Sequence, residues 1–177
     1  MRVTSATVDD LDALADLWVE LAAGQRAFGS HLRAELNRTP IRETLARHVA
    51  LGGVLIAHER GERDSASADE EDDSGGSSRV VGFVMFNVES GAYEQDVTRG
   101  TISNLFVVPD RRGDGVGSEL LAAAEDELEE WGADVVALDV MAENENARKF
   151  YRRHGYQPHR IQLEKSMRND THSKEDQ

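Results

Sequence analysis

The stretch that decides the fold is Thr101 to Leu121, which reads TISNLFVVPDRRGDGVGSELL. It begins as an apolar, β-branched run, breaks at Pro109, passes through a basic, glycine-rich turn and enters an apolar-periodic segment that runs to Trp131. This order predicts a strand, a tight loop and a helix. Because the loop lies where the helix begins, several of its backbone N–H groups have no intrahelical partner and are suited to bind a phosphate or diphosphate.

The spacing of the loop residues indicates which class of phosphate compound the loop could bind. A Walker loop requires Lys after its last glycine, and none follows Gly117. A dinucleotide fingerprint requires a third glycine, but Ser118 stands where that glycine is needed after Gly113-x-Gly115. The pattern that fits is Arg112-x-x-Gly115-x-Gly117 following a strand.

A second motif lies downstream, and it reads Asn-x-x-Ala-x-x-Phe-Tyr-x-x-x-Gly-Tyr between Asn144 and Tyr156. By spacing alone, Ala147, Phe150 and Tyr151 form one apolar face of a short helix that Gly155 ends. Together with the glycine-rich loop, this motif resembles the GNAT superfamily of N-acetyltransferases. The resemblance extends from Arg2 to Met167.

The resemblance implies acetyl-coenzyme A as co-substrate, with the loop amides holding its diphosphate. In that fold the strands that end at Val108 and Met141 splay apart, and the pantetheine arm pairs with the backbone of residues 106–108 like an added strand. The cofactor-binding residues implied are Phe106, Val107, Val108, Arg112, Gly113, Asp114, Gly115, Val116, Gly117, Ser118, Asn144, Ala147, Phe150 and Tyr151.

The implied activity is transfer of the acetyl group to a primary amine, which is a protein N-terminus, a lysine or a small molecule. By analogy the N–H of Val107, or of a neighbour at the strand break, stabilises the oxyanion. Tyr151 protonates the leaving thiolate, because a phenol pKa of about 10 matches that of an alkyl thiol. Two alternatives are a sensor that binds acyl-coenzyme A without turnover, and an acyltransferase or structural protein that uses a different acyl group.

The general base and the acceptor site stay open. Several members of the superfamily carry a glutamate on the central strand, whereas residues 101–108 contain no carboxylate. Glu89, Asp139, Glu143 or a chain of waters are the alternatives. In the fold implied, the first helical pair forms one wall of the acceptor site, which makes Phe28 and His31, together with Glu89, candidate substrate contacts.

The periodicities predict a mixed α/β fold in a single domain, residues 1–167, with a central, mostly antiparallel twisted sheet of six to seven strands flanked by about four helices. The strands expected are Arg2–Ala6, Val54–His58, Val80–Val88, Thr101–Val108, Val135–Met141 and Gln157–Met167. The helices expected begin near Leu11, near His31 with an interruption at Pro40, at Gly115 and at Asn144.

Two polar stretches predict irregular structure. Residues 59–79 are rich in Asp, Glu, Ser and Gly and have no apolar periodicity, which predicts a disordered acidic insertion that expands a β-hairpin. Residues 168–177 predict a polar, flexible tail.

Composition excludes several classes of function. The net charge of −14 argues against a nucleic-acid partner. With Lys nearly missing, it also suggests adaptation to a salt-rich cytoplasm, to be tested by unfolding in molar KCl. No cysteine is present, and the histidines lack ligand spacing, so no metal site is expected. No apolar run has the length of a membrane span, so we expect a cytoplasmic protein, and the resemblance suggests a homodimer.

Overall fold

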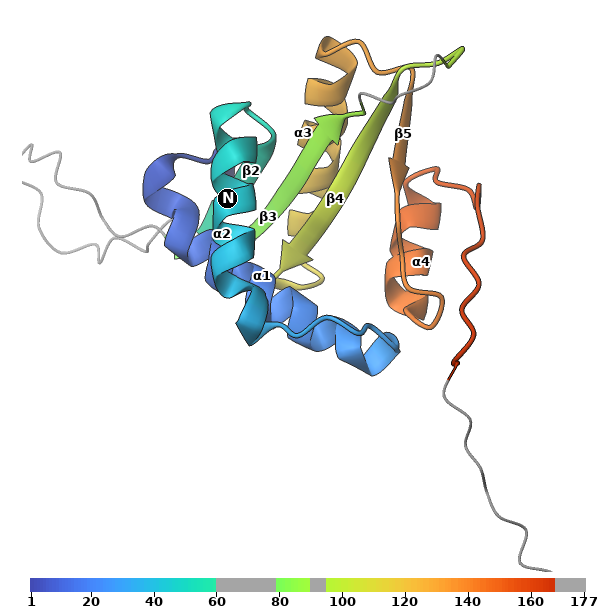
Figure 1. The fold of residues 1–177 in the computed structure, drawn as a ribbon. Helices are drawn as coiled ribbons and strands as arrows, with labels where there is room; N and C mark the ends of the chain where they lie inside the picture. The colour runs from blue at the N-terminus through green and yellow to red at the C-terminus, as the bar shows by residue number, and fades with distance from the viewer. Residues whose placement is uncertain (60–78, 90–94, 168–177) are drawn as a thin grey trace, which may run out of the picture. The chain divides into compact units, whose positions relative to one another are not determined.

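A computed structural model describes residues 1–59, 79–89 and 95–167 of the chain. The chain divides into two units, Met1–Glu143 and Asn144–Gln177, and each is described by itself. The first unit contains a five-stranded sheet in the order β1-β2-β3-β4-β5 (Figure 1). Its strands are β1 (Arg2–Ser5), β2 (Val54–Glu59), β3 (Arg79–Val88), β4 (Arg99–Val107) and β5 (Val135–Leu138).

The sheet is mostly antiparallel, as the sequence predicts. Neighbouring strands from β1 to β4 pair antiparallel, and β4 pairs with β5 in parallel. The connection between the parallel strands is the helix α3 (Val116–Glu130), which crosses the sheet to bring the chain back to the same end. The mixed α/β fold class is therefore confirmed.

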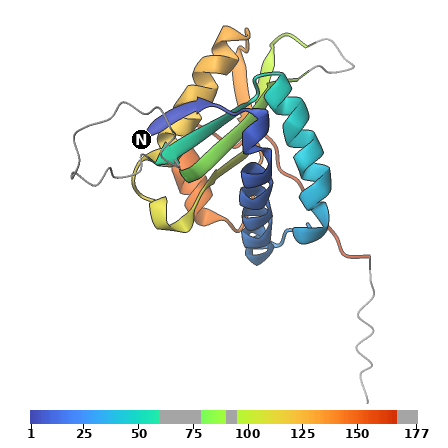
Figure 2. The same cartoon turned by 90° about the vertical axis from the view of Figure 1, so that its left-hand side faces the viewer.

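Helices cover both faces of this sheet. The helices α1 (Leu11–Gln25) and α2 (Arg38–Ala50) lie side by side on one face, and α3 lies on the other (Figures 1 and 2). Because β3 is covered on both sides, it is apolar along nearly its whole length rather than alternating. The largest side chains buried between the layers are Phe83, Phe86, Leu14, Leu45, Ile56, Leu120, Leu121 and Leu128.

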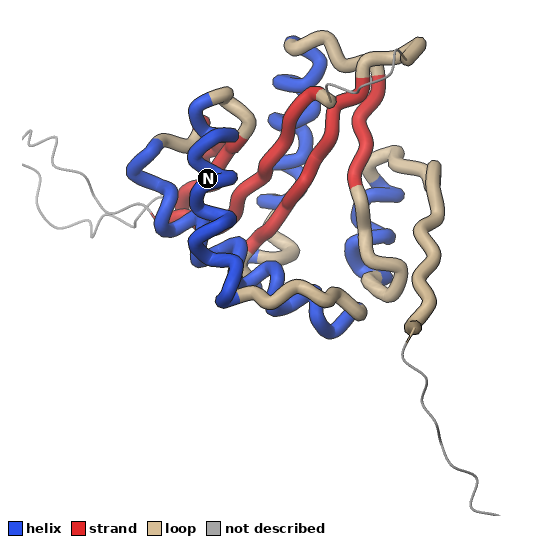
Figure 3. The backbone as a smooth tube through the Cα atoms, viewed as in Figure 1, coloured by secondary structure: helices blue, strands red, loops and turns tan. Residues whose placement is uncertain are grey.

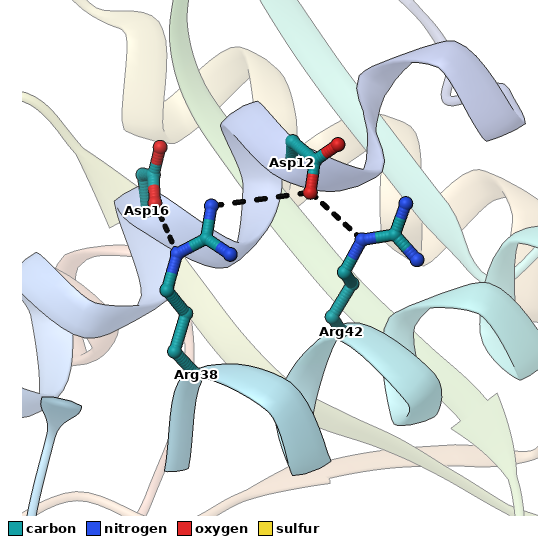
Figure 4. A network of polar contacts seen from close by, with 4 residues as sticks. All are labelled: Asp12, Asp16, Arg38 and Arg42. Atoms are coloured by element: carbon teal, nitrogen blue, oxygen red, sulfur yellow. Dashed lines mark hydrogen bonds and ion pairs between the residues drawn. The ribbon is translucent and has the colours of Figure 1, made fainter. Parts of the chain in front are cut away.

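A network of exposed charges joins α1 to α2 (Figure 4). Arg42 Nε lies 2.7 Å from Asp12 Oδ1, and Arg38 Nε lies 2.7 Å from Asp16 Oδ1. The hydrogen bond from Arg42 holds the pKa of Asp12 below its ordinary value. Exposed pairs of this kind contribute little to stability, so the buried apolar faces of the two helices hold them together.

Three sequence-based expectations are wrong in detail. Pro40 does not interrupt a helix, because α2 begins at Arg38 and places the proline in its first turn, where a backbone N–H has no intrahelical partner. The strand expected to reach Met141 ends at Leu138. The sheet has five strands rather than six to seven.

The missing sixth strand was expected at Gln157–Met167, in the second unit. The described residues of this unit contain α4 (Glu145–Arg153), followed by a segment without regular structure. Its apolar side chains alternate, which suggested a strand, but Ile161 and Leu163 are 85% and 89% exposed. A strand needs a neighbour to pair with its backbone, and none of the described residues supplies one here.

The acidic insertion is shorter than expected at both ends. Glu59 is the last residue of β2 and Arg79 is the first residue of β3, and the two are opposite each other in the register of the hairpin. The rest of the insertion, residues 60–78, and the tail at 168–177 lie outside the described residues.

Gly53, the residue before β2, lies close to the backbone of β3. Its carbonyl oxygen accepts a hydrogen bond of 2.9 Å from the N–H of Phe86. A Cβ on residue 53 would lie 2.4 Å from the carbonyl oxygen of Phe86, which cannot move without disturbing β3. The start of β2 therefore requires glycine at this position.

We predict that Gly53→Ala lowers the free energy of unfolding by about 1–3 kcal/mol, because the added methyl group overlaps backbone atoms. Gly24→Ala is the matched control, since no atom lies within 4 Å of a Cβ at that helical position. The control should be neutral or stabilising. Thermal unfolding followed by circular dichroism measures both, and equal midpoints for the two variants would contradict this account of the packing.

Candidate active site

The site is built where β5 ends and β4 continues. The parallel pairing of the two strands covers four residue pairs, from Arg99 with Val135 to Ile102 with Leu138. Beyond Ile102, β4 runs on to Val107 while the chain after β5 turns away from it (Figure 3). Among the described residues, no strand pairs with 103–107 of β4 on this side. The edge is thus open to an extended ligand.

Val107 presents its backbone to this open edge. The N–H of Val108 donates to the carbonyl oxygen of Val81 on β3 at 2.9 Å. Since successive residues of a strand direct their N–H and C=O groups to opposite sides, those of Val107 point away from β3. The carbonyl of Val107 accepts a hydrogen bond of 2.9 Å from Arg112 Nε, in agreement with this direction.

The three residues predicted to pair with the arm, 106–108, do not all face the open edge, because backbone groups alternate in direction along the strand. Phe106 and Val108 direct their backbone groups toward β3, so only Val107 of the three offers a backbone N–H to the open edge. Leu105 offers a second one by the same rule, and it was not among the predicted residues. The sequence did not predict this direction, because no local pattern reveals which strand edge remains unpaired.

The glycine-rich loop follows directly. A short turn, Pro109–Arg111, leads to an extended residue, Arg112, and α3 begins at Val116 with Gly115 as its N-cap. Gly113 has φ +92° and Gly115 has φ +87°, a left-handed backbone that residues with a Cβ adopt at a cost. No atom lies within 4 Å of a Cβ built on either glycine, so the backbone angle, not crowding, requires glycine here.

The loop leaves its amides without partners. Among the described residues, the N–H groups of 113–117 donate no backbone hydrogen bond, and donation resumes at Ser118, whose N–H bonds to the carbonyl of Gly115 at 2.9 Å. Val116 is buried and anchors the helix start in the core. Unpaired amides at the positive end of a 15-residue helix are suited to bind an anion.

Arg112 ties this loop to the end of β4. Besides the bond from its Nε to the carbonyl of Val107, its guanidinium carbon lies 5.5 Å from the centre of the Phe106 ring. The ring of Phe106 is itself buried. Arg112 therefore connects the glycine-rich loop to the open strand edge.

The second motif forms the short helix α4. Asn144 caps it, because its Oδ1 accepts a hydrogen bond of 3.1 Å from the N–H of Ala147. The ring of Phe150 lies 4.4 Å from that of His154, and the ring of Tyr151 lies 5.7 Å from that of Tyr156. These contacts are internal to the second unit, and they explain the aromatic spacing of the motif.

Burial changes the acidity of Tyr151. Desolvation disfavours the phenolate and raises the pKa of Tyr151 to about 12. The hydroxyl consequently keeps its proton across the neutral range. It is also a weaker acid than the ordinary phenol on which the match with an alkyl thiol was based.

Phe28 and His31, the candidate acceptor residues, lie between α1 and α2 and differ in their exposure to solvent. Phe28 is half-buried at the end of the turn Arg26–Phe28, and His31 is exposed in the segment between α1 and α2. A Cβ on Gly29 would lie 4.0 Å from Met141 Cε, so this segment approaches the chain just after β5. The segment thus reaches the region where β4 and β5 diverge.

Glu89 is not brought together with Val107. Its carboxylate accepts a hydrogen bond of 2.7 Å from the hydroxyl of Thr101 and lies 3.8 Å from Arg99 Nε. Thr101 stands six residues before Val107 on β4, which is roughly 20 Å along a strand. The other two candidate bases, Asp139 and Glu143, are exposed after the end of β5 and have no partner among the described residues.

The described residues contain neither a metal-binding cluster nor a membrane-spanning helix. No group of three or more histidine, aspartate or glutamate side chains there is arranged to hold a metal ion. No helix within the same residues has both the length and the apolar character needed to cross a membrane.

Comparisons with known proteins agree with the geometry. Residues 30–156 match the family model described as "Acetyltransferase (GNAT) family". An aminoalkylphosphonate N-acetyltransferase of Salmonella typhimurium is 32% identical over 88 residues, which is 50% of this chain and 56% of the relative. A mycothiol acetyltransferase of Clavibacter sepedonicus is 35% identical over 155 residues, which is 86% of this chain and 41% of the relative. The chain thus spans about half the length of the curated relatives it matches first.

Solved structures share the fold. A mutant of a Bacillus halodurans protein superposes with a TM-score of 0.74 at 20% identity, covering 94% of this chain and 99% of that one. A GCN5-related N-acetyltransferase from Ralstonia eutropha superposes with a TM-score of 0.67 at 22% identity, covering 93% of this chain and 97% of that one. With the family match over residues 30–156, these findings show that the chain belongs to the GNAT family of acetyltransferases.

Proposed function

We propose that this protein transfers the acetyl group of acetyl-coenzyme A to a primary amine by direct attack in a ternary complex. The observation that carries the proposal is the continuity of two binding features in one unit. The open edge of β4 ends at Val107, and the unpaired amides of 113–117 begin six residues later. A ligand with an extended amide-containing arm and a diphosphate fits both.

The residues present fit coenzyme A on structural grounds. The loop offers backbone N–H groups and the helix end a partial positive charge, and the space above Gly113 and Gly115 is open to a diphosphate. The open edge offers two N–H donors, that of Leu105 for an amide carbonyl of an arm lying along the edge and that of Val107 for the thioester oxygen. Asn144, Ala147, Phe150 and Tyr151 are assigned to the coenzyme through the family's second motif.

The acyl transfer requires stabilisation of an oxyanion. The amine nitrogen attacks the thioester carbonyl carbon, and negative charge develops on its oxygen before the carbon–sulfur bond breaks. The N–H of Val107 donates to that oxygen, because it is fixed by the β-sheet and faces the open edge. A donor fixed in advance stabilises the developing charge without reorganisation.

The leaving sulfur requires a proton, which Tyr151 supplies in our proposal. Its pKa of about 12 means that the hydroxyl is protonated at neutral pH and acts as a donor rather than a base. The apolar surroundings that raise the phenol pKa also raise that of a thiol held beside it. The amine gives its own proton to water or to a carboxylate after β5, Asp139 or Glu143.

The acceptor belongs to the class of primary amines, and the relatives differ within it. The Salmonella relative is named for an aminoalkylphosphonate, and the matched relative of Schizosaccharomyces pombe is an N-alpha-acetyltransferase. The segment between α1 and α2, with Phe28 and His31, is our candidate for the acceptor wall, since it approaches the end of β5. Binding of the coenzyme without turnover of any amine would favour a sensor instead.

We predict that Gly113→Ala and Gly115→Ala each weaken binding of coenzyme A at least about tenfold, because a Cβ disfavours the left-handed backbone that aims the amides. Isothermal calorimetry on the folded variants measures the dissociation constant. Gly132→Ala is the control, since Gly132 has a similar φ of +82° at the opposite end of α3. It should lose stability but bind the coenzyme normally, and equal weakening in all three variants would contradict the anion loop.

We predict that Tyr151→Phe lowers kcat by about 100-fold or more while the KM for acetyl-coenzyme A changes little, because the variant keeps the ring and loses the proton donor. Thiol release with a panel of amines and peptides measures both constants, with Tyr156→Phe as the control. Since the hydroxyl is protonated at every pH below about 12, wild-type activity should show no loss due to Tyr151 up to roughly pH 11. Unchanged turnover in Tyr151→Phe would show that another group protonates the thiolate.

A further inference from the structure

Two ion pairs connect the base of the acidic insertion to the turn that precedes the anion loop. Glu59 and Arg79 flank residues 60–78 and face each other across the β2–β3 hairpin. Each of them pairs with one of two consecutive residues of the turn Pro109–Arg111: Arg79 with Asp110, and Glu59 with Arg111. The motif at 112–118 begins at the next residue.

The geometry of the two pairs is specific. Arg79 Nη1 lies 3.0 Å from Asp110 Oδ2, and Arg111 Nη2 donates a hydrogen bond to Glu59 Oε1. The side chains of Arg111 and Glu59 are 34% and 33% exposed, so this pair is partly shielded from water. The hydrogen bond from Arg79 lowers the pKa of Asp110, and the bond to Glu59 raises that of Arg111, so both pairs persist at neutral pH.

The pairing separates the roles of two adjacent arginines. Arg111 is engaged by Glu59, and Asp110 and Asp114 add further negative charge around its guanidinium. Its backbone N–H bonds to the carbonyl of Val108 at 3.0 Å. The side chain of Arg112 points instead to β4, where it meets the Val107 carbonyl and the Phe106 ring. Arg111 is therefore built into the scaffold under the loop.

We propose that Glu59, Arg79, Asp110 and Arg111 are positioning residues for the coenzyme site, a four-residue clamp that holds the start of the diphosphate loop against the β2–β3 hairpin. The inference rests on the proposed function, because it assumes that the loop binds the diphosphate. The clamp acts on coenzyme affinity and not on the acyl-transfer step, since none of its four side chains reaches the open edge of β4 in the arrangement described.

The physical reason lies in the glycines. Gly113 and Gly115 give the loop its left-handed turns but also leave it more free to change shape than other residues would. The unpaired amides of 113–117 act together only if the loop is held at both ends. Val116 holds the far end in the core, and the clamp holds the near end.

Charge-neutral double variants test the clamp. Glu59→Gln with Arg111→Gln, and Arg79→Gln with Asp110→Asn, each break a pair without changing the net charge of the protein. We expect each to raise the dissociation constant of coenzyme A and the KM for acetyl-coenzyme A about three- to fivefold, the most that an exposed pair usually contributes, with kcat within about twofold. Asp12→Asn with Arg42→Gln breaks a similar exposed pair between α1 and α2 and should leave coenzyme affinity unchanged.

Further variants separate positioning from direct contact. The single changes Glu59→Gln and Arg111→Gln should weaken binding to the same degree as the double, because removing either partner removes the same ion pair. Exchanging the charges, with Arg79→Asp and Asp110→Arg together, should restore affinity to within about twofold of wild type. Circular dichroism and the thermal midpoint establish that each variant is folded before binding is measured.

Two results overturn the clamp. Neutral doubles that bind coenzyme A as well as the wild type would show that the ion pairs do not position the loop. Tighter binding in Glu59→Gln with weaker binding in Arg111→Gln would show that Arg111 contacts the diphosphate directly. A wild-type protein that binds no coenzyme A contradicts the proposed function itself, which distinguishes that failure from the failure of the clamp.

Discussion

The left-handed backbone at Gly113 and Gly115 is the constraint on which the site depends. It lets the chain turn from β4 into α3 within a few residues while the amides of 113–117 stay free of internal partners. A turn made by ordinary residues would carry a strain of about 1–2 kcal/mol at each such position. The same turn brings the start of α3 close behind the end of β4, so the unpaired amides follow the open edge within a few residues.

The rest of the first unit holds that turn in place. The helix α3 buries Val116 at its start and Leu120, Leu121 and Leu128 along its length, which fixes its direction against the sheet. On the strand side, β3 pairs with β4 as far as Val107 and leaves the opposite edge open only where β5 stops. The short length of β5 is what leaves this edge of β4 unpaired, since a longer strand would continue the pairing past Ile102.

The fold and the anion loop could be predicted from the sequence because their signals are local. Apolar periodicity located α1, α3 and four of the five strands closely, and glycines next to a helix start identified the loop. The expected strand at Gln157–Met167 failed because alternation of Ile161 and Leu163 does not reveal whether a partner strand exists. The expected interruption at Pro40 also failed. A proline breaks a helix in its interior, but Pro40 lies in the first turn of α2, where a proline is accommodated.

The parts of the site that escaped prediction depend on contacts between distant residues. No local pattern reveals that Val107 and Leu105, but not Phe106 and Val108, face the open edge, because this follows from the register with β3. The engagement of Glu89 by Thr101 and the two pairs made by Glu59 and Arg79 are likewise products of the hairpins. The raised pKa of Tyr151 arises from burial, which a reference value does not contain.

The central claim is that the backbone amides of 113–117 bind the diphosphate of coenzyme A. Titration of the nitrogen-15-labelled protein with coenzyme A, followed by amide NMR, tests it directly. We predict large, saturable shifts of the Gly113, Gly115 and Gly117 amides, with no comparable change at Gly132. Loop amides that keep their free-state positions at saturating coenzyme would contradict the account.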